Sequence, residues 1–249
     1  MNPAPATTTF AHTRLVSLLA SLGGPALKKV EPRQFGPRLG GLIDLSSSVA
    51  LADTLGGLDK AAFEVAEEQP ARAREDFFRV RAAMISAVMR SLVPGSGPSR
   101  IIWPEEVSAD GGADALKRFY AAHQREMEAR VRGLQERVRH VLLDTDPALA
   151  RLATLDTALA NALLSHTRRL FAGIPALVAR RQVALREVEG GPQQLKAELQ
   201  GLLLAEVDAR LLPVQGLVEA LEDHLNDCAS KHADKRAAKR KASESETDE

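Results

Sequence analysis

Four arginines recur at intervals of seven residues in the middle of the chain: Arg118, Arg125, Arg132 and Arg139. Because seven residues make almost two turns of an α-helix, these side chains would line one flank of a single long helix. A guanidinium group is permanently charged and binds both carboxylates and phosphates through paired hydrogen bonds. The stripe could therefore pair with acidic helices inside the protein, bind an acidic partner protein, or follow the phosphates of a nucleic acid.

The charge layout favours internal pairing. Residues 117–139 hold seven basic and three acidic side chains, and residues 168–186 hold five basic and no acidic ones. Residues 196–227 are the reverse, with seven acidic and two basic side chains. Because the formal net charge of the chain is zero, we expect helices of opposite charge to pair within a bundle. Nucleic-acid binding is the alternative, although the stripe lacks interleaved aromatic residues and a recognisable reading module.

A second cluster has residue types that bind metals: His224, Cys228 and His232, each four residues apart. The first two would share one helix face, as paired zinc ligands do. The third is turned by about 80° at 100° per residue, and no second cluster completes the coordination shell. We therefore predict a solvated helix end without a metal, and we place His166 at the edge of the core.

Motifs for catalysis are absent from the sequence. There is no Gly-x-Ser-x-Gly nucleophile turn and no Walker-type phosphate loop. The carboxylates lie on polar helix faces, where a solvated surface explains them. We predict that the protein is not an enzyme and needs no cofactor.

One short apolar segment stands apart from the helices. Ile101-Ile102-Trp103-Pro104 follows a Pro, Gly and Ser-rich stretch over 94–99 and contains the only tryptophan. Isolated apolar segments in loops usually pack locally. We expect Trp103 to anchor this segment on a helical surface, and a partner-binding peptide is the alternative.

The arginine stripe belongs to a long predicted helix over about residues 113–143. Its apolar residues are spaced three and four apart, as on the buried stripe of an α-helix. One heptad position holds Tyr120, Met127, Leu134 and Val141, and another holds Gln124, Val131, Val138 and Thr145. The repeat is too short to predict a two-stranded coiled coil, so we expect a hairpin of packed helices.

The limits of the following helices can be read from capping and helix-breaking residues. Asp144-Thr145-Asp146-Pro147 combines capping residues with a proline suited to a first helical turn, and predicts a helix restart. Pro175 should either kink that helix or open the next one. The sequence Gly190-Gly191-Pro192 ends it, and a last helix is expected over 193–226, with a kink at Pro213.

The composition excludes several classes of protein. The 249 residues are 45% hydrophobic but only 4% aromatic, a leucine, alanine and valine content that favours helix packing over sheets. Cys228 is the only cysteine, so intramolecular disulfides and cysteine-based zinc fingers are excluded. No apolar run is long enough to span a membrane, and no cleavable signal peptide is apparent, so we expect a cytoplasmic protein.

The predicted fold is all-α: an elongated helical bundle with long antiparallel helices and disordered termini. Residues 1–9 form a disordered N-terminus, and residues 10–93 form an N-terminal helical region with helices near 10–22, 35–55 and 70–93. Residues 94–112 are a linker, and residues 113–227 form the long-helix bundle. Residues 228–249 are expected to be a disordered charged tail, with six basic side chains and one acidic side chain over 231–241.

Several phrases resemble an uncharacterised proteobacterial family, a "domain of unknown function" of similar length. The resemblance covers most of residues 10–226 and leaves out the tail after Cys228. It implies an all-α fold and a bacterial source, and it provides no catalytic residues. It also implies an assembly partner among envelope proteins similar to outer-membrane protein A or to motor stators. The phrases are those at 70–82, at 147–156 (Pro147-Ala148-Leu149 with Leu152-Ala153-Thr154-Leu155-Asp156) and at 203–214 (Leu203 to Leu211 with Pro213-Val214).

These observations together predict a non-enzymatic helical protein that self-associates or binds another coiled-coil protein, as a scaffold of an envelope-linked assembly. The competing hypothesis is a nucleic-acid-associated protein that uses the arginine stripe and the basic tail.

Overall fold

The computed structural model describes residues 14–24, 32–43, 48–49, 52–54, 56, 69–93, 97–108 and 112–245. Every regular element in these residues is a helix. The all-α prediction is therefore confirmed. Residues 1–9, which we expected to be disordered, lie outside the described residues.

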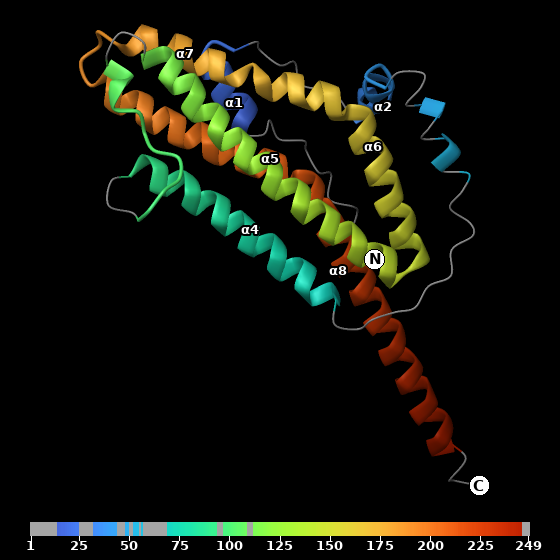
Figure 1. The fold of residues 1–249 in the computed structure, drawn as a ribbon. Helices are drawn as coiled ribbons and strands as arrows, with labels where there is room; N and C mark the ends of the chain where they lie inside the picture. Colours follow the sequence, from blue (N-terminus) through green and yellow to red (C-terminus); the bar gives the residue numbers. More distant parts are fainter. Residues whose placement is uncertain are drawn as a thin grey trace.

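Four long helical members form the body of the protein (Figure 1). They are α4 (Gln69–Leu92), α5 (Gly112–Thr145), the pair α6 (Pro147–Ala172) and α7 (Ile174–Leu185), and α8 (Gly191–Ser245). Neighbouring members alternate in direction, as in an up-and-down bundle. On α4 and α5, for example, Asp76 pairs with Arg137, whereas Ser91 contacts His123.

The bundle extends further toward the N-terminus than the predicted domain limits. We assigned residues 70–93 to a separate N-terminal region, yet α4 packs against both α5 and α8. Its apolar stripe, which includes Phe77, Met84 and Val88, belongs to the same hydrophobic core as Leu134 and Leu211. The helices of 69–93 and 112–225 therefore form one packed unit.

The predicted stripe of α5 faces this core. Tyr120, Met127 and Leu134 are buried, and so are two of the polar residues at heptad positions, Gln124 and Thr145. Leucines every three or four residues on α8 cover the opposite side of the core. The buried residues of α8 include Leu195, Leu199, Leu202, Leu203, Val207, Leu211, Val214, Leu217, Val218 and Leu221.

Local capping fixes the ends of α6. The carboxylate of Asp146 accepts a hydrogen bond from the backbone N–H of Ala148 (2.8 Å), and Pro147 occupies the first helical position. This is the predicted restart, because the cap satisfies an N–H group that the helix cannot. The break that follows is at Gly173, and Pro175 lies in the first turn of α7. Of the two outcomes expected for Pro175, the opening of the next helix is the one observed.

The turn between α7 and α8 needs glycine. Gly190 has a φ of +73°, a conformation that side chains with a Cβ rarely adopt. At Gly191 a Cβ would collide with the backbone oxygen of Leu185. The predicted end of the helical stretch at Gly190-Gly191 is therefore confirmed.

Shorter helices flank the bundle. The first, α1 (Arg14–Ser21), packs on α8 through Leu15 and Leu19. The next, α2 (Pro32–Gly40), covers only the start of the helix expected over 35–55, and about half of the remainder lies outside the described residues. The linker over 94–112 contains one 3-10 helix, η2 (Glu105–Ser108), and Gln182 donates a hydrogen bond to the backbone oxygen of Val107 (2.7 Å).

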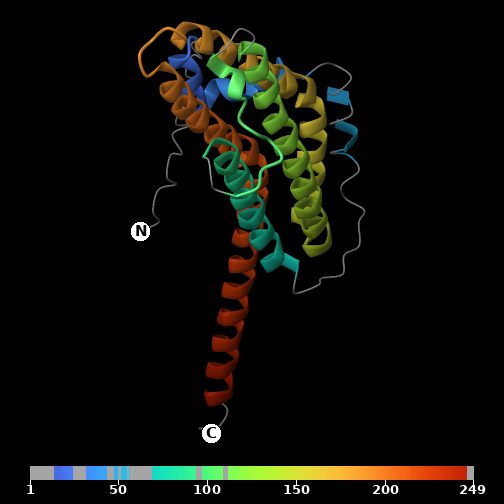
Figure 2. The same cartoon turned by 60° about the vertical axis from the view of Figure 1, so that its left-hand side comes forward.

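The last helix differs most from its prediction. We expected it to end near Asn226 and the tail from 228 to be disordered, but α8 continues to Ser245 and passes through Pro213. Figure 2 shows its C-terminal part projecting well beyond the bundle. Loss of apolar periodicity ends packing without ending the helix, because alanine, lysine, arginine and glutamate have high helix propensity. None of the helices in the described ranges combines the length and apolar character that crossing a membrane requires.

Candidate functional site

Among the residues that the structure describes, Glu206 on α8 is the one fully buried carboxylate of the core. It accepts hydrogen bonds from Tyr120 Oη (2.7 Å) and from Gln124 Nε2 (3.1 Å), both on α5. Arg210, one turn later on α8, donates to the same carboxylate (Nε–Oε1 2.8 Å). Arg210 Nη2 also lies 2.8 Å from Oε1, which makes four donor groups around two oxygens and matches the acceptor capacity of an ionised carboxylate.

This buried polar network, which we define as Tyr120, Gln124, Glu206 and Arg210, also reaches the end of α6. Gln124 Nε2 donates to the backbone oxygen of Phe171 (2.9 Å), and the Arg210 guanidinium lies 3.8 Å from the centre of the Phe171 ring. Burial and the neighbouring Glu206 charge raise the pKa of Tyr120 well above its usual value. Tyr120 therefore stays a protonated donor at neutral pH, and the network links α5, α6 and α8 at one level.

The sequence indicates this network only indirectly. Spacing places Tyr120 in the apolar stripe of its helix, and it shows Glu206 and Arg210 only as residues four apart in the order that favours pairing on one helix. A usable signal was available: Glu206 lies among Leu202, Leu203 and Val207, and a carboxylate at such a position must have a partner.

A second buried polar pair, Ser91 with His123, was not predicted. Ser91 Oγ lies 2.8 Å from His123 Nε2 and donates its own proton to the backbone oxygen of Val88. The histidine ring also packs edge-on against Phe119, with centroids 4.9 Å apart. Burial lowers the pKa of His123 to about 4, although Glu126 acts in the opposite sense. The pair is neutral at pH 7 and fully enclosed, so it has no access to a substrate.

The arginine stripe is divided between two environments. The Arg139 guanidinium pairs with Asp156 on α6 (Nη2–Oδ2 2.6 Å), and only about a sixth of either side chain is exposed. Arg118, Arg125 and Arg132 are exposed and form no ion pair with the residues that the structure describes. Internal pairing is therefore observed for one member of the stripe, and its partner is on α6 rather than on the acidic last helix.

The acidic last helix has other basic partners. Arg181 on α7 forms two hydrogen bonds with Glu198 (2.8 and 2.7 Å), and these hold the pKa of Glu198 below its usual value. On the α4 side, Arg74 pairs with Glu222 and Arg81 pairs with Asp208. Helices of opposite charge thus do pair. The basic partners of the α8 carboxylates lie on α7, within the predicted basic stretch 168–186, and on α4, which was not predicted to pair with it.

The division of the stripe leads to a testable difference in stability. Arg139→Glu should lower the free energy of unfolding by roughly 2–4 kcal/mol, because it places two carboxylates in a half-buried contact. Arg125→Glu/Arg132→Glu should change it by less than about 0.5 kcal/mol, since both side chains are solvated. Urea unfolding followed by circular dichroism measures both changes. Equal losses in the two variants would contradict this assignment.

Trp103 packs as an anchor, as expected. Its ring meets Phe119 edge-on with centroids 5.4 Å apart, and Lys196 Nζ lies 5.6 Å above it. The neighbouring Ile102 is 77% exposed. The segment is thus fixed by Trp103 on α5 and exposes one isoleucine.

The histidine and cysteine cluster has no metal-binding geometry in the described residues. His224 Nε2 lies 3.5 Å from Cys228 Sγ and 3.8 Å from Asp146 Oδ2. No group of three potential ligands converges there or elsewhere among the side chains that the structure describes. The side chain of His232 lies outside the described residues.

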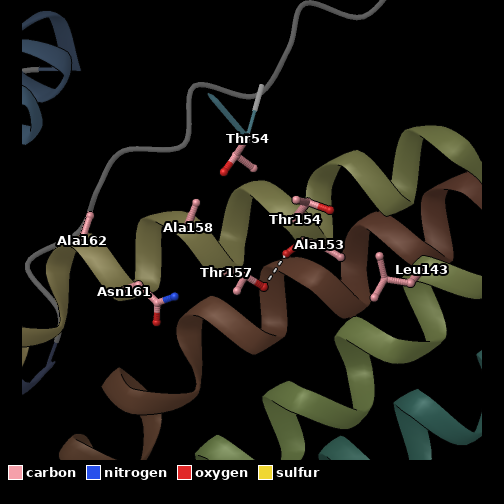
Figure 3. Close-up of a pocket in the computed structure, with 8 residues that line it drawn as sticks. All are labelled: Thr54, Leu143, Ala153, Thr154, Thr157, Ala158, Asn161 and Ala162. Atoms are coloured by element: carbon pink, nitrogen blue, oxygen red, sulfur yellow. Dashed lines mark hydrogen bonds between the residues drawn. The ribbon is translucent and has the colours of Figure 1, made fainter. Parts of the chain in front are cut away.

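A pocket of about 400 Å³ lies against α6 (Figure 3). Thr54 faces α6 across it, and the α6 wall consists mainly of small side chains. The hydroxyls of Thr154 and Thr157 donate to backbone oxygens of their own helix, at 2.8 Å each. Because none of the described residues that line it has a charged side chain, the pocket suits close packing of apolar groups rather than catalysis. Its lining is Thr54, Leu143, Ala153, Thr154, Thr157, Ala158, Asn161 and Ala162.

The comparisons with known proteins identify a family. The family described as "Protein of unknown function (DUF3348)" matches residues 1–197. The chain belongs to this family, in agreement with the resemblance, although the phrase at 203–214 lies beyond the matched residues. Comparison with curated proteins and with solved structures gives no match.

Proposed function

We propose that this member of the DUF3348 family is a non-enzymatic helical assembly protein that binds itself or another helical protein through apolar helix faces. The observation that carries the proposal is the apolar stripe of α6. Leu152, Leu155 and Leu159 are only partly buried, and Leu170, three turns beyond Leu159 on the same face, is 58% exposed. A contiguous apolar helix face of this kind gains free energy when a partner helix covers it.

The location of the polar groups supports the same proposal. The side chains most able to do acid–base chemistry, Tyr120, His123 and Glu206, are enclosed in the core and satisfied by one another or by their neighbours. A catalytic group must be within hydrogen-bonding reach of a substrate. We therefore assign these groups to fold specificity, and we assign function to the surface.

The proposal also covers where the protein acts and how it pairs with its partner. We place the protein in the cytoplasm, on the grounds of its sequence, and the family resemblance suggests an envelope-linked assembly as the larger structure. Coiled-coil pairing with the partner is the mode that the helical repeats favour.

Cross-linking in cells tests the proposal. The tagged full chain is cross-linked in its own organism, purified and analysed by mass spectrometry, beside a Leu170→Ser variant that alters the exposed part of the stripe. We expect the chain itself or one helical protein in stoichiometric amount, and at least a several-fold lower yield with the variant. Recovery of the chain alone and uncross-linked would contradict the proposal.

The exposed part of the stripe favours one second candidate, a nucleic-acid-associated protein. Arg118, Arg125 and Arg132 lie unpaired on one flank of α5, and the projecting part of α8 carries the basic run of 231–241. DNA affinity that falls steeply with salt, and that Arg125→Glu/Arg132→Glu abolishes without loss of stability, would support it. Protein partner binding that is unchanged after removal of residues 232–249 would favour the first proposal.

A further inference from the structure

A groove of about 390 Å³ runs between α4 and α8. Its floor is apolar and buried, with Phe77 from α4 and Leu211 and Val218 from α8. Two large apolar side chains on its walls remain exposed to solvent: Phe78, at 53%, and Leu212, at 49%. The core thus continues outward here into an apolar strip that nothing in the described residues covers.

The strip is shaped like a helix-packing seam. On α4 the residues that line it are spaced four and three apart, at Arg74, Phe78 and Arg81. The lining residues of α8 repeat the same spacing over more than three turns. This spacing is the one that packs a helix against others at a shallow angle. The α8 series is Asp208, Leu212, Gln215, Glu219 and Glu222.

The two walls carry opposite charge. Arg74 and Arg81 line the α4 wall, and Asp208, Glu219 and Glu222 line the α8 wall. Two ion pairs cross the groove, between Arg74 and Glu222 at 3.2 Å and between Arg81 and Asp208 at 3.0 Å. Between about two-fifths and three-fifths of each of these side chains is exposed, so each carboxylate has lone pairs free for a second guanidinium.

A surface with a basic wall, an apolar strip and an acidic wall is complementary to itself. If a two-fold axis runs along the groove, α4 of one copy lies over α8 of the other, and the basic wall meets the acidic wall. Phe78 and Leu212 of both copies then cover the strip. An axis across the groove would instead bring the two basic walls together and the two acidic walls together.

We propose that the α4–α8 groove, lined by Phe78 and Leu212, is the self-association face of this protein and binds a second copy in this orientation. The inference rests on the proposed function, since it names self-association as one form of the assembly and assigns it to this groove. The α6 stripe is left for a different helical protein. Three carboxylates on one wall make the groove unsuitable for nucleic-acid phosphates.

The orientation has a geometric consequence for the projecting end of α8. With the axis along the helices, both C-terminal extensions leave the dimer at the same end. Cys228, the single cysteine, lies 13 residues beyond Gln215 at the middle of the α8 series, or about 20 Å at 1.5 Å per residue. Two labels at Cys228 are then level along the axis, whereas the crossed orientation separates them by about 40 Å along it.

Sedimentation equilibrium of the full chain tests the inference with a matched pair of variants. Phe78→Ser/Leu212→Ser alters the groove, and Val183→Ser/Val188→Ser alters two side chains of similar exposure, 63% and 48%, elsewhere. We expect a dimer for the wild type and for the control. The groove variant should show a dissociation constant raised by at least about 100-fold, since central apolar residues dominate such interfaces. Circular dichroism and thermal melting check that both variants are folded.

Spin labels at Cys228 then test the orientation by pulsed electron–electron resonance. A short, narrow distribution of distances between the two labels supports an axis along the groove. A distribution shifted to longer distances, as the crossed orientation requires, contradicts it. A dimer that survives the groove variant overturns the inference but leaves the proposed function intact. If the wild type is a monomer and another protein covers the groove, a second copy is not the partner that binds there. A monomer that binds no protein overturns both proposals.

Discussion

Arg210→Met is expected to lower the free energy of unfolding by about 3–5 kcal/mol. The substitution leaves Glu206 with no compensating cation at a position with no solvent exposure. Tyr120 and Gln124 still donate to the carboxylate, but they cannot neutralise its charge. The cation–π contact with Phe171 is lost in the same step. Urea unfolding at pH 7, followed by far-ultraviolet circular dichroism, measures the change.

A surface pair provides the control. Arg81→Met removes the cation from a pair in which both side chains are about half exposed, so we expect a loss of at most about 1 kcal/mol. Replacing the whole charged network by apolar groups should cost far less than Arg210→Met, because no buried charge is left unpaired. The variant Tyr120→Phe/Glu206→Leu/Arg210→Met makes this replacement. If Arg210→Met were as mild as Arg81→Met, the buried network would not be a charged one.

The same network explains why α5, α6 and α8 adopt one register. Their apolar stripes consist largely of leucine, and stripes of similar side chains can slide past one another by a turn at low cost. Glu206 finds its donors only when its turn of α8 lies beside Tyr120 and Gln124 of α5. A shift by one turn, about 5.4 Å, would leave a buried charge without partners. Here polar burial contributes specificity more than stability.

The local features of this fold could be predicted from the sequence because short-range chemistry determines them. Asp146 and Pro147 start α6 by capping, and the turn before α8 needs glycine, because Gly190 has a positive φ and a Cβ at Gly191 would collide with Leu185. Each of these features depends only on residues close by in the sequence. Their residue types therefore indicate their structure without knowledge of any neighbouring helix.

The pairing of side chains between helices could not be predicted in the same way. Heptad spacing places Arg139 on the flank of α5, but it does not reveal that α6 returns along that flank and brings Asp156 to it. For the same reason the spacing could not separate Arg139 from Arg125 and Arg132. The end of α8 was mispredicted for another reason: apolar periodicity reports packing, whereas helix propensity alone continues the helix to Ser245.

The stability of the protein should fall on mild acidification because of His123. Burial lowers the pKa of this histidine to about 4, whereas a histidine in the unfolded chain titrates near 6.5. Between these values the unfolded chain binds a proton that the folded protein does not, so protonation favours unfolding. The contribution is fully present above pH 6.5 and is lost as the pH falls from 6.5 toward 4. The difference between the pKa of His123 in the unfolded chain and in the folded protein corresponds to about 3 kcal/mol in the free energy of unfolding.

The His123→Met variant isolates this contribution, because methionine fills the site without a titrating group. Carboxylates whose pKa is lowered in the folded protein, such as Glu198, are present in both proteins, and their effect cancels in the difference between the two. Urea unfolding at pH 7.5 and at pH 4.5 should therefore show a loss for the wild type that exceeds the loss for the variant by about 2–3 kcal/mol. His140→Met, which changes an exposed histidine of the same helix, should behave as the wild type does. Parallel pH profiles for wild type and His123→Met would mean that His123 titrates normally in the folded state. In that case the Ser91–His123 pair would be open to water, and its assignment to the closed core would be wrong.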